Sequence, residues 1–322
     1  MQPFASLNTG LSFLGAHATR VLFLGIFLGI ALPPLASLAR PLLAPAVVLL
    51  LSATLLRVDW SAMREYARRP VLATLLTAWL LLGAPVISWL LLSRLVLPES
   101  LTTAIVLMAA APPILSAAAI AVLLDLDGAL AVVAGLISTL LTPLTVPPLA
   151  LALLGIALDI SMFDFMLRLG GIVVVAFLAA LAIRHVAPPG WLHAHRSGID
   201  GVVVILMLLF AVAIMDGVTE TAIARPGMVA LWVLAAFVAN PVLQLLGMAA
   251  FSWLGRRGAL TVGLISGNCN MGLLLASLPP AADFDVLLFF ALAQLPIFML
   301  PAMMLPVYRR LLPETAAPEL RD

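Results

Sequence analysis

The stretch GLISGNCNMGLLLASLPP (263–280) places a run of small and polar residues, Ser266 to Asn270, inside an apolar segment long enough to cross a membrane. Hydrocarbon offers no partner to unpaired backbone groups, so an interruption at that depth must face protein or a water-filled cavity. Gly267 loosens the helix, and the side chains of Asn268 and Asn270 can replace lost backbone partners. The stretch therefore predicts a membrane helix broken into two halves near the bilayer centre.

The composition extends this interpretation to the whole chain. Of 322 residues, 64% are hydrophobic and 10% are charged, whereas soluble proteins carry about 25% charged residues. Apolar segments close to the hydrocarbon thickness recur along the chain. We place ten of them at 19–38, 41–57, 71–92, 100–124, 128–153, 165–186, 198–217, 227–254, 258–280 and 285–309. The sequence thus predicts an all-α membrane protein with ten transmembrane helices.

The arginines predict the orientation of these helices. All 16 basic residues are arginines, and a cytoplasmic N-terminus would put only Arg40, Arg94, Arg168 and Arg225 outside, leaving 16 − 4 = 12 inside. Because cytoplasmic loops are enriched in basic residues, both termini are predicted to be cytoplasmic. The loop 57–69, which includes Arg64 and Arg68, is the strongest anchor. We expect an integral protein of a bacterial inner membrane.

Two halves of the chain are related by a nearly constant offset. RPVLATLLTAWLLLGAPV (69–86) is similar to RPGMVALWVLAAFVANPV (225–242), offset 225 − 69 = 156, and DLD (125–127) is similar to DFD (283–285), offset 283 − 125 = 158. This predicts a five-helix repeat at 1–156 and a second at 157–322. An odd number of spans inverts the second repeat relative to the first, which is typical of secondary transporters.

The repeat also pairs two helix breaks. An offset of 158 places residues 111–113 opposite 269–271. Pro112 and Pro113 remove two backbone donors, so the fourth helix is predicted to be broken as well. Breaks at equivalent positions of an inverted repeat are expected to cross, with Cys269 as a small packing residue between them.

Polar residues around the two breaks are the candidates for binding. We expect solute contacts from Ser116, Ser266, Asn268, Asn270 and Thr139. Helix capping or packing is the alternative role for each of them. The second half-helices, from Ile114 and Met271, would direct positive helix ends toward an anion. The carbonyl ends of the first halves, near Ala111 and Gly267, suit a cation.

Other polar residues suggest structural roles. Asn240, Gln244 and Gln294 lie within apolar spans and are expected to face the protein interior as packing contacts. The aspartates of DLD and DFD lie at span ends, where hydrated helix caps are expected. No nucleophile–base pair, metal cluster or acid pair lies at membrane depth, so we predict a protein that is not an enzyme.

With its broken ninth span GNCNMGLLLASL (267–278) and its fifth span GALAVVAGLISTLLTPLTVPPL (128–149), the chain resembles the bile acid:sodium symporter family of organic-anion transporters. The resemblance implies a panel of residues 19–57 and 165–217 and a core of residues 71–153 and 227–309. It also implies that solute lies in the crevice between panel and core, behind the helix crossing. A sodium ion, if one binds, is expected near Gly267, Asn268 and Ser138.

The chain departs from the family where its sodium-coupled members bind the ion. They carry a Glu before the ninth-helix break, where this chain has Ile265, and a Ser-Asn pair where it has Ala117–Ala118. The fifth-helix hydroxyls fall on Ala131 and Gly135, and a Gln falls on Cys269. The resemblance therefore implies the fold and the transport class, while the side chains that would bind sodium are missing.

Together these features predict a secondary transporter that moves a small organic, anionic solute across the lipid bilayer by alternating access. Sodium is the one candidate coupling ion, and no cofactor, nucleic acid or obligatory protein partner is expected. Alternatives are an auxin-efflux-type exporter of weak acids or a uniporter. Outside transport, the alternative is a membrane receptor or assembly subunit, which would leave the broken helices unexplained.

Overall fold

The structure, a computed structural model, describes residues 18–58, 69–155, 161–188, 190–279 and 282–312. Within these ranges the elements are helices and there is no strand. Seven helices are long and apolar enough to cross a membrane: 33–56, 70–92, 128–154, 162–186, 196–224, 226–250 and 284–301. An all-α integral membrane protein is thereby confirmed. The count of ten spans and the inverted repeat remain predictions, and Arg64, Arg68, Arg321 and both chain ends lie outside the described residues.

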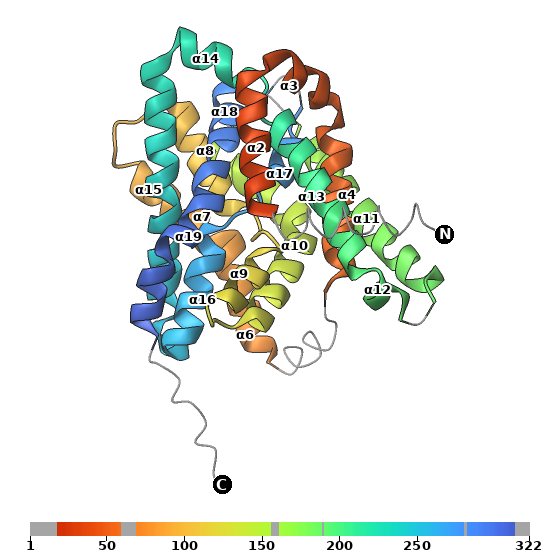
Figure 1. Cartoon of the computed structure of the whole chain (residues 1–322). Coiled ribbons are helices and arrows are strands. Elements are labelled where there is room, and N and C mark those ends of the chain that lie inside the picture. Colours follow the sequence, from red (N-terminus) through yellow and green to blue (C-terminus); the bar gives the residue numbers. More distant parts are fainter. Residues whose placement is uncertain (1–17, 59–68, 156–160, 189, 280–281, 313–322) are drawn as a thin grey trace.

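One group of helices, called the panel here, packs mainly on itself. It consists of α2 (Ala18–Ala31), α3 (Pro33–Ala39), η1 (Arg40–Leu42), α4 (Leu43–Leu56), α11 (Met162–Val186), α12 (Trp191–Ala194) and α13 (Arg196–Ala213). Helix α13 contacts α2, α3 and α4, and α4 contacts α11. These helices occupy the centre and the right of the view in Figure 1.

The chain turns between the first two panel helices earlier than the sequence predicted. The expected turn was at residues 39–40, but the helix ends at Ala31 and a new one runs from Pro33 through η1 to Leu56. Proline disfavours helical angles in the residue before it, and Leu32 accordingly has φ −126° and ψ 72°. The first two predicted spans are therefore wrong at this boundary.

The second group, called the core here, contains the two broken helices. It consists of α6 (Pro70–Ala78), η2 (Trp79–Gly83), α7 (Ala84–Leu92), α8 (Glu99–Ala110), α9 (Ala117–Leu123), α10 (Gly128–Leu154), α15 (Pro226–Ala250), η3 (Ser252–Leu254), α16 (Gly255–Gly267), α17 (Met271–Ser277), α18 (Phe284–Leu292) and α19 (Gln294–Leu311). Helix α15 packs on α16 and α18, and α8 packs on α7 and α18. Fully buried Leu273, Leu274, Phe289 and Phe290 belong to the largest apolar cluster.

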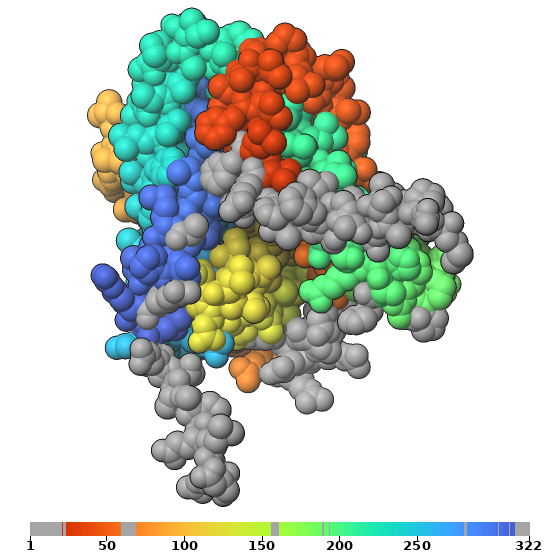
Figure 2. All heavy atoms as spheres, in the orientation of Figure 1, coloured from red at the N-terminus to blue at the C-terminus, as the bar shows by residue number. Residues whose placement is uncertain are grey.

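Panel and core meet along α10, α11, α4 and α17. In Figure 2 the yellow surface around α9 and α10 lies between the blue C-terminal helices of the core and the green helices of the panel. A short helix, α14 (Val218–Ala224), links α13 to α15 and contacts both α2 and α15. Helix α17, which follows one of the two breaks, thus lies beside the panel.

Prolines reshape two core helices, which the sequence predicted as the spans 71–92 and 285–309. In the span 70–92, η2 is a π-helical segment ahead of Pro85, and a wider turn accommodates a proline that cannot donate to the preceding turn. Helices α18 and α19 are separated at Ala293, because the ring of Pro296 excludes the carbonyl of Leu292 from its normal partner.

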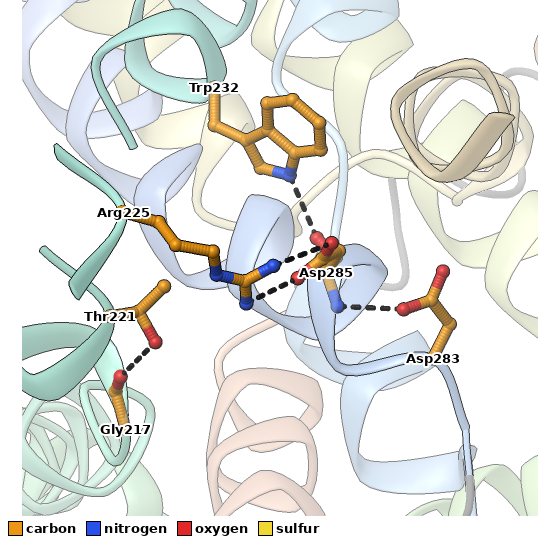
Figure 3. Close-up of polar contacts among 6 residues, drawn as sticks. All are labelled: Gly217, Thr221, Arg225, Trp232, Asp283 and Asp285. Atoms are coloured by element: carbon orange, nitrogen blue, oxygen red, sulfur yellow. Dashed lines mark hydrogen bonds and ion pairs between the residues drawn. The ribbon is translucent and has the colours of Figure 1, made fainter. Parts of the chain in front are cut away.

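An ion pair fixes the start of α15 to the start of α18. Arg225 donates to both carboxylate oxygens of Asp285, at 2.9 and 3.2 Å, and the Trp232 indole donates to the Asp285 backbone oxygen at 2.9 Å (Figure 3). The Asp283 side chain accepts from the Asp285 N–H at 2.9 Å and caps α18. The predicted capping role is confirmed for Asp283, and Asp127 caps α10 by accepting from the Leu130 N–H at 2.9 Å.

Candidate functional site

The two interrupted helices cross and bond to each other. Helix α8 ends at Ala110, where the chain becomes extended, and α16 ends at Gly267. Pro113 and Cys269 then form an isolated antiparallel bridge. The interruptions lie where the sequence predicted them.

Two backbone hydrogen bonds hold this crossing. The Ile114 N–H donates to the Asn268 backbone oxygen at 2.9 Å, and the Asn270 N–H donates to the Pro112 backbone oxygen at 2.7 Å. Each break therefore supplies hydrogen-bond partners to backbone groups that the other break leaves unpaired within its own helix, as apolar surroundings require. Because Ile114 bonds across the crossing, α9 begins at Ala117 and not at Ile114 as predicted.

Three of the predicted solute-binding side chains are buried and bond within their own helices. Ser266 donates to the Val262 oxygen at 2.7 Å, and Asn268 donates to the Leu264 oxygen at 2.8 Å. Thr139 donates to the Gly135 oxygen at 2.7 Å. These contacts correspond to the packing alternative, and a role in solute binding stays a prediction for all three.

The other two predicted side chains are more accessible. Ser116 is exposed, and its side chain makes no capping hydrogen bond at the start of α9. Asn270 is half-buried and caps α17 by accepting from the Leu273 N–H at 3.2 Å. Cys269 is buried at the crossing, with its thiol donating to the Ser266 oxygen at 3.2 Å.

The oxygens predicted to suit sodium are in two different conditions. The Gly267 carbonyl accepts from Asn240 Nδ2 at 2.8 Å, and the Asn268 carbonyl accepts from Ile114. By contrast, Asn268 Oδ1 and Ser138 Oγ are buried with no hydrogen-bond partner among the described residues. These two side-chain atoms are therefore the unpaired oxygens among the residues predicted to bind sodium.

A chain of buried hydrogen bonds leads from α19 through α15 to the break that follows α16. Tyr308 donates to Gln244 Oε1 at 2.8 Å, Gln244 Nε2 donates to Asn240 Oδ1 at 2.7 Å, and Asn240 Nδ2 donates to the Gly267 oxygen. A carbonyl oxygen only accepts, so its partner must be the Asn240 nitrogen, and each following partner is then fixed in turn. Asn240 and Gln244 face the interior, as the sequence predicted.

Sequence reasoning missed two members of this region. Trp79, in the π-helical segment, donates to Ser266 Oγ at 3.0 Å, and Tyr308 is buried within α19. An aromatic side chain with a polar tip inside an apolar span needs a hydrogen-bond partner, and this requirement is the signal that could have identified both.

A cavity of about 450 Å³ lies between panel and core. Its walls come from η1, α4, α11 and α13 on one side and from α17 and α18 on the other. Leu275, Leu288 and Ile214 contribute apolar surface. Arg40 and Arg168 line it as well, and the sequence places both on the outer side.

The charge in this cavity is unevenly neutralised. Arg40 forms an ion pair with Asp216 at 2.9 Å, whereas Arg168 is exposed and forms no ion pair with any described residue. Another cavity, between α6 and α10, has no charged residue in its lining. The panel–core cavity therefore combines an apolar body with a net positive rim.

Residues 44–225 match the model of the family described as the Sodium Bile acid symporter family. The match covers 225 − 44 + 1 = 182 residues, more than half of the chain. It extends from the start of α4 to the residue before α15. No curated protein matches the chain.

Proposed function

The chain belongs to the sodium bile acid symporter family, and from this premise we propose that it carries a small organic anion across the membrane by alternating access. At the level of the family, the protein is a membrane transporter. The solute, the direction of transport and the mechanism are the proposed part.

The observation that carries the proposal is the bonded crossing of the two broken helices. Broken helices at membrane depth are tolerated where they line a cavity or are buried in protein, and secondary transporters build their sites from them. Here the bridge between Pro113 and Cys269 places both breaks at one position in the core. Helix α17, which starts at this crossing, contacts α4 and α11 of the panel. A movement of panel against core would therefore change access to the crossing.

The cavity between panel and core supports an anionic solute with an apolar part. Helices α9 and α17 are only seven residues long, and the Asn270 side chain already accepts from the first turn of α17. Their N-termini are therefore weaker support for anion binding than the guanidinium groups of Arg40 and Arg168. A guanidinium binds a carboxylate or sulfonate through paired donors, while the apolar walls accept the hydrocarbon part of the solute.

The proposal is tested in two steps with the full chain. Purified protein is first heated with a panel of organic acids and of neutral analogues of the same size, because a solute that binds the folded state raises the melting temperature. Acids that stabilise are then offered to proteoliposomes. Uptake of the acid and not of its neutral analogue supports the proposal.

Other results would favour the alternatives. Faster efflux than uptake of a weak acid would identify an exporter, and equilibration without accumulation would identify a uniporter. Stabilisation by a ligand that is never transported would favour a receptor. Absence of both binding and transport across the panel would contradict the proposal for organic acids.

A further inference from the structure

The carbonyl end of α16 is the place where a cation would be expected in this fold, because the C-terminus of a helix carries partial negative charge. In this chain the carbonyls of Leu264, Ser266 and Gly267 already accept hydrogen bonds from the protein. The Leu264 oxygen accepts from the Asn268 backbone at 3.1 Å and from its side chain at 2.8 Å. The Ser266 oxygen accepts from the Cys269 thiol, and the Gly267 oxygen accepts from the Asn240 amide.

Close packing of α15 on α16 brings the two backbones into direct contact beside Gly267. A methyl group added at Gly267 would lie 2.6 Å from the Asn240 backbone oxygen and 2.5 Å from Gln244 Cγ. A methyl group at Gly263 would lie 2.7 Å from the Gln244 backbone oxygen. Glycines therefore allow the two backbones to approach closely, as small residues do between membrane helices.

The Asn240 amide cannot turn away from Gly267 without cost. Its oxygen accepts from Gln244 Nε2, and the Gln244 oxygen accepts from Tyr308. Reversing the Asn240 amide would bring its oxygen against the Gly267 carbonyl oxygen and its nitrogen against Gln244 Nε2. The hydrogen-bond chain thus holds an N–H group against the end of α16, where it partly neutralises the negative helix end.

A sodium ion at this position would also lack a counter-charge. The buried polar side chains of the described residues are hydroxyls and amides, and none is a carboxylate. A full positive charge at membrane depth is costly without an opposite charge or a complete set of ligands. Asn268 Oδ1 and Ser138 Oγ are the unpartnered buried oxygens of the predicted sodium site, and two neutral ligands do not make such a set.

We propose that the Asn240 amide takes the place of a coupling cation at the end of α16, so that the helix crossing is complete without sodium. This proposal deepens the proposed function. One consequence depends on that function: transport of the solute should proceed at the same rate in sodium chloride and in choline chloride. The hydrogen-bond chain from Tyr308 to Gly267 then stabilises the negative end of α16 at all times, whereas a coupling ion would do so only while it is bound.

The test measures thermal unfolding of the full chain in detergent, in sodium chloride and in choline chloride at equal ionic strength and pH 8. Sodium at ten times its dissociation constant would raise the melting temperature by about 2–4 °C. The native chain is expected to melt at the same temperature in both salts. A saturable, sodium-specific rise in the native chain would overturn the proposal.

Two variants extend this test, because one of them is expected to respond to sodium and the other is not. Asn240→Asp replaces the donor at Gly267 by a carboxylate, so the variant is expected to be destabilised in choline chloride and partly rescued by sodium. Gln294→Glu makes the same chemical change at another buried amide, which donates to the Phe290 oxygen at 3.2 Å, and should lose stability equally in both salts. Equal responses of the two variants to sodium would also overturn the proposal.

These measurements need no transported solute. A chain that moves no organic acid would contradict the proposed function, while its salt response would still decide whether sodium binds at the crossing.

Discussion

Replacing Gly267 by alanine should disrupt the joint between α15 and α16. The new methyl group would lie 2.6 Å from the Asn240 backbone oxygen, whereas ordinary contacts begin at 3.4 Å. The backbone of α15 would have to move by 3.4 − 2.6 = 0.8 Å. The hydrogen bond from Asn240 to the Gly267 oxygen, now 2.8 Å long, would then be stretched beyond the normal range.

The cost follows from two contributions. Overfilling a packed position costs about 1–3 kcal/mol, and the loss of one buried hydrogen bond costs about 1 kcal/mol. We therefore expect Gly267→Ala to lower the free energy of unfolding by about 2–4 kcal/mol. For a chain of this size, the melting temperature should fall by about 3–6 °C.

The assay is thermal unfolding of purified protein followed by tryptophan fluorescence, with solute binding measured on the same samples. Gly171→Ala is the matched control, because no heavy atom lies within 4 Å of the added methyl group. Alanine is also more favourable than glycine in the interior of a helix such as α11. That variant should be unchanged or stabilised by up to about 1 kcal/mol. If Gly267→Ala melts like the Gly171→Ala control, the close approach of α15 to the crossing is refuted.

Three further substitutions test other parts of the structure. Asp285→Asn should lower the melting temperature by about 1–3 °C, less at high salt, because its ion pair with Arg225 is partly exposed. Trp79→Phe should cost about 1 kcal/mol by removing the donor to Ser266, measured by thermal unfolding. Arg168→Gln should raise the solute concentration for half-maximal uptake by about 3–10-fold without changing the maximal rate, because it removes charge at the cavity rim.

Each of these substitutions has a control of the same chemical kind. Asp125→Asn removes a more exposed ion pair and should change the melting temperature by less than about 1 °C. Trp253→Phe alters a side chain that is 61% exposed and should be silent. Arg94→Gln removes an arginine that does not line the cavity and should leave half-maximal uptake unchanged. A control as damaging as its partner would contradict the corresponding interpretation.

Local sequence was sufficient where the chemistry is local. Pro112 and Pro113 cannot supply backbone donors, and the polar run around Gly267 cannot continue an apolar helix unaided, so both breaks could be located from sequence. The same reasoning failed at Pro33, where a proline was treated as the middle of a span although it forces Leu32 out of helical angles. Prolines in α10, in contrast, leave the helix continuous from Gly128 to Leu154.

The partners of the buried polar groups could not be found in this way. Nothing within the sequence near Asn240 indicates that its amide meets the Gly267 carbonyl, 27 positions away, or that Trp79 reaches Ser266, 187 positions away. The sequence therefore predicted a cation site at carbonyls such as that of Gly267, because their hydrogen-bond donors cannot be identified from sequence. Likewise, Arg168 was only a topological marker until the fold placed it at a cavity.

By itself, the sequence determined that this chain lies in a membrane and that two of its helices break, one at Pro112–Pro113 and the other at Gly267. Those properties depend on hydrophobic length and on backbone donors, which are counted along the chain. The tertiary structure alone decided that the two breaks bond to each other and which donors the carbonyls at the end of α16 accept from. A hydrogen bond across two helices depends on their relative position and not on their composition.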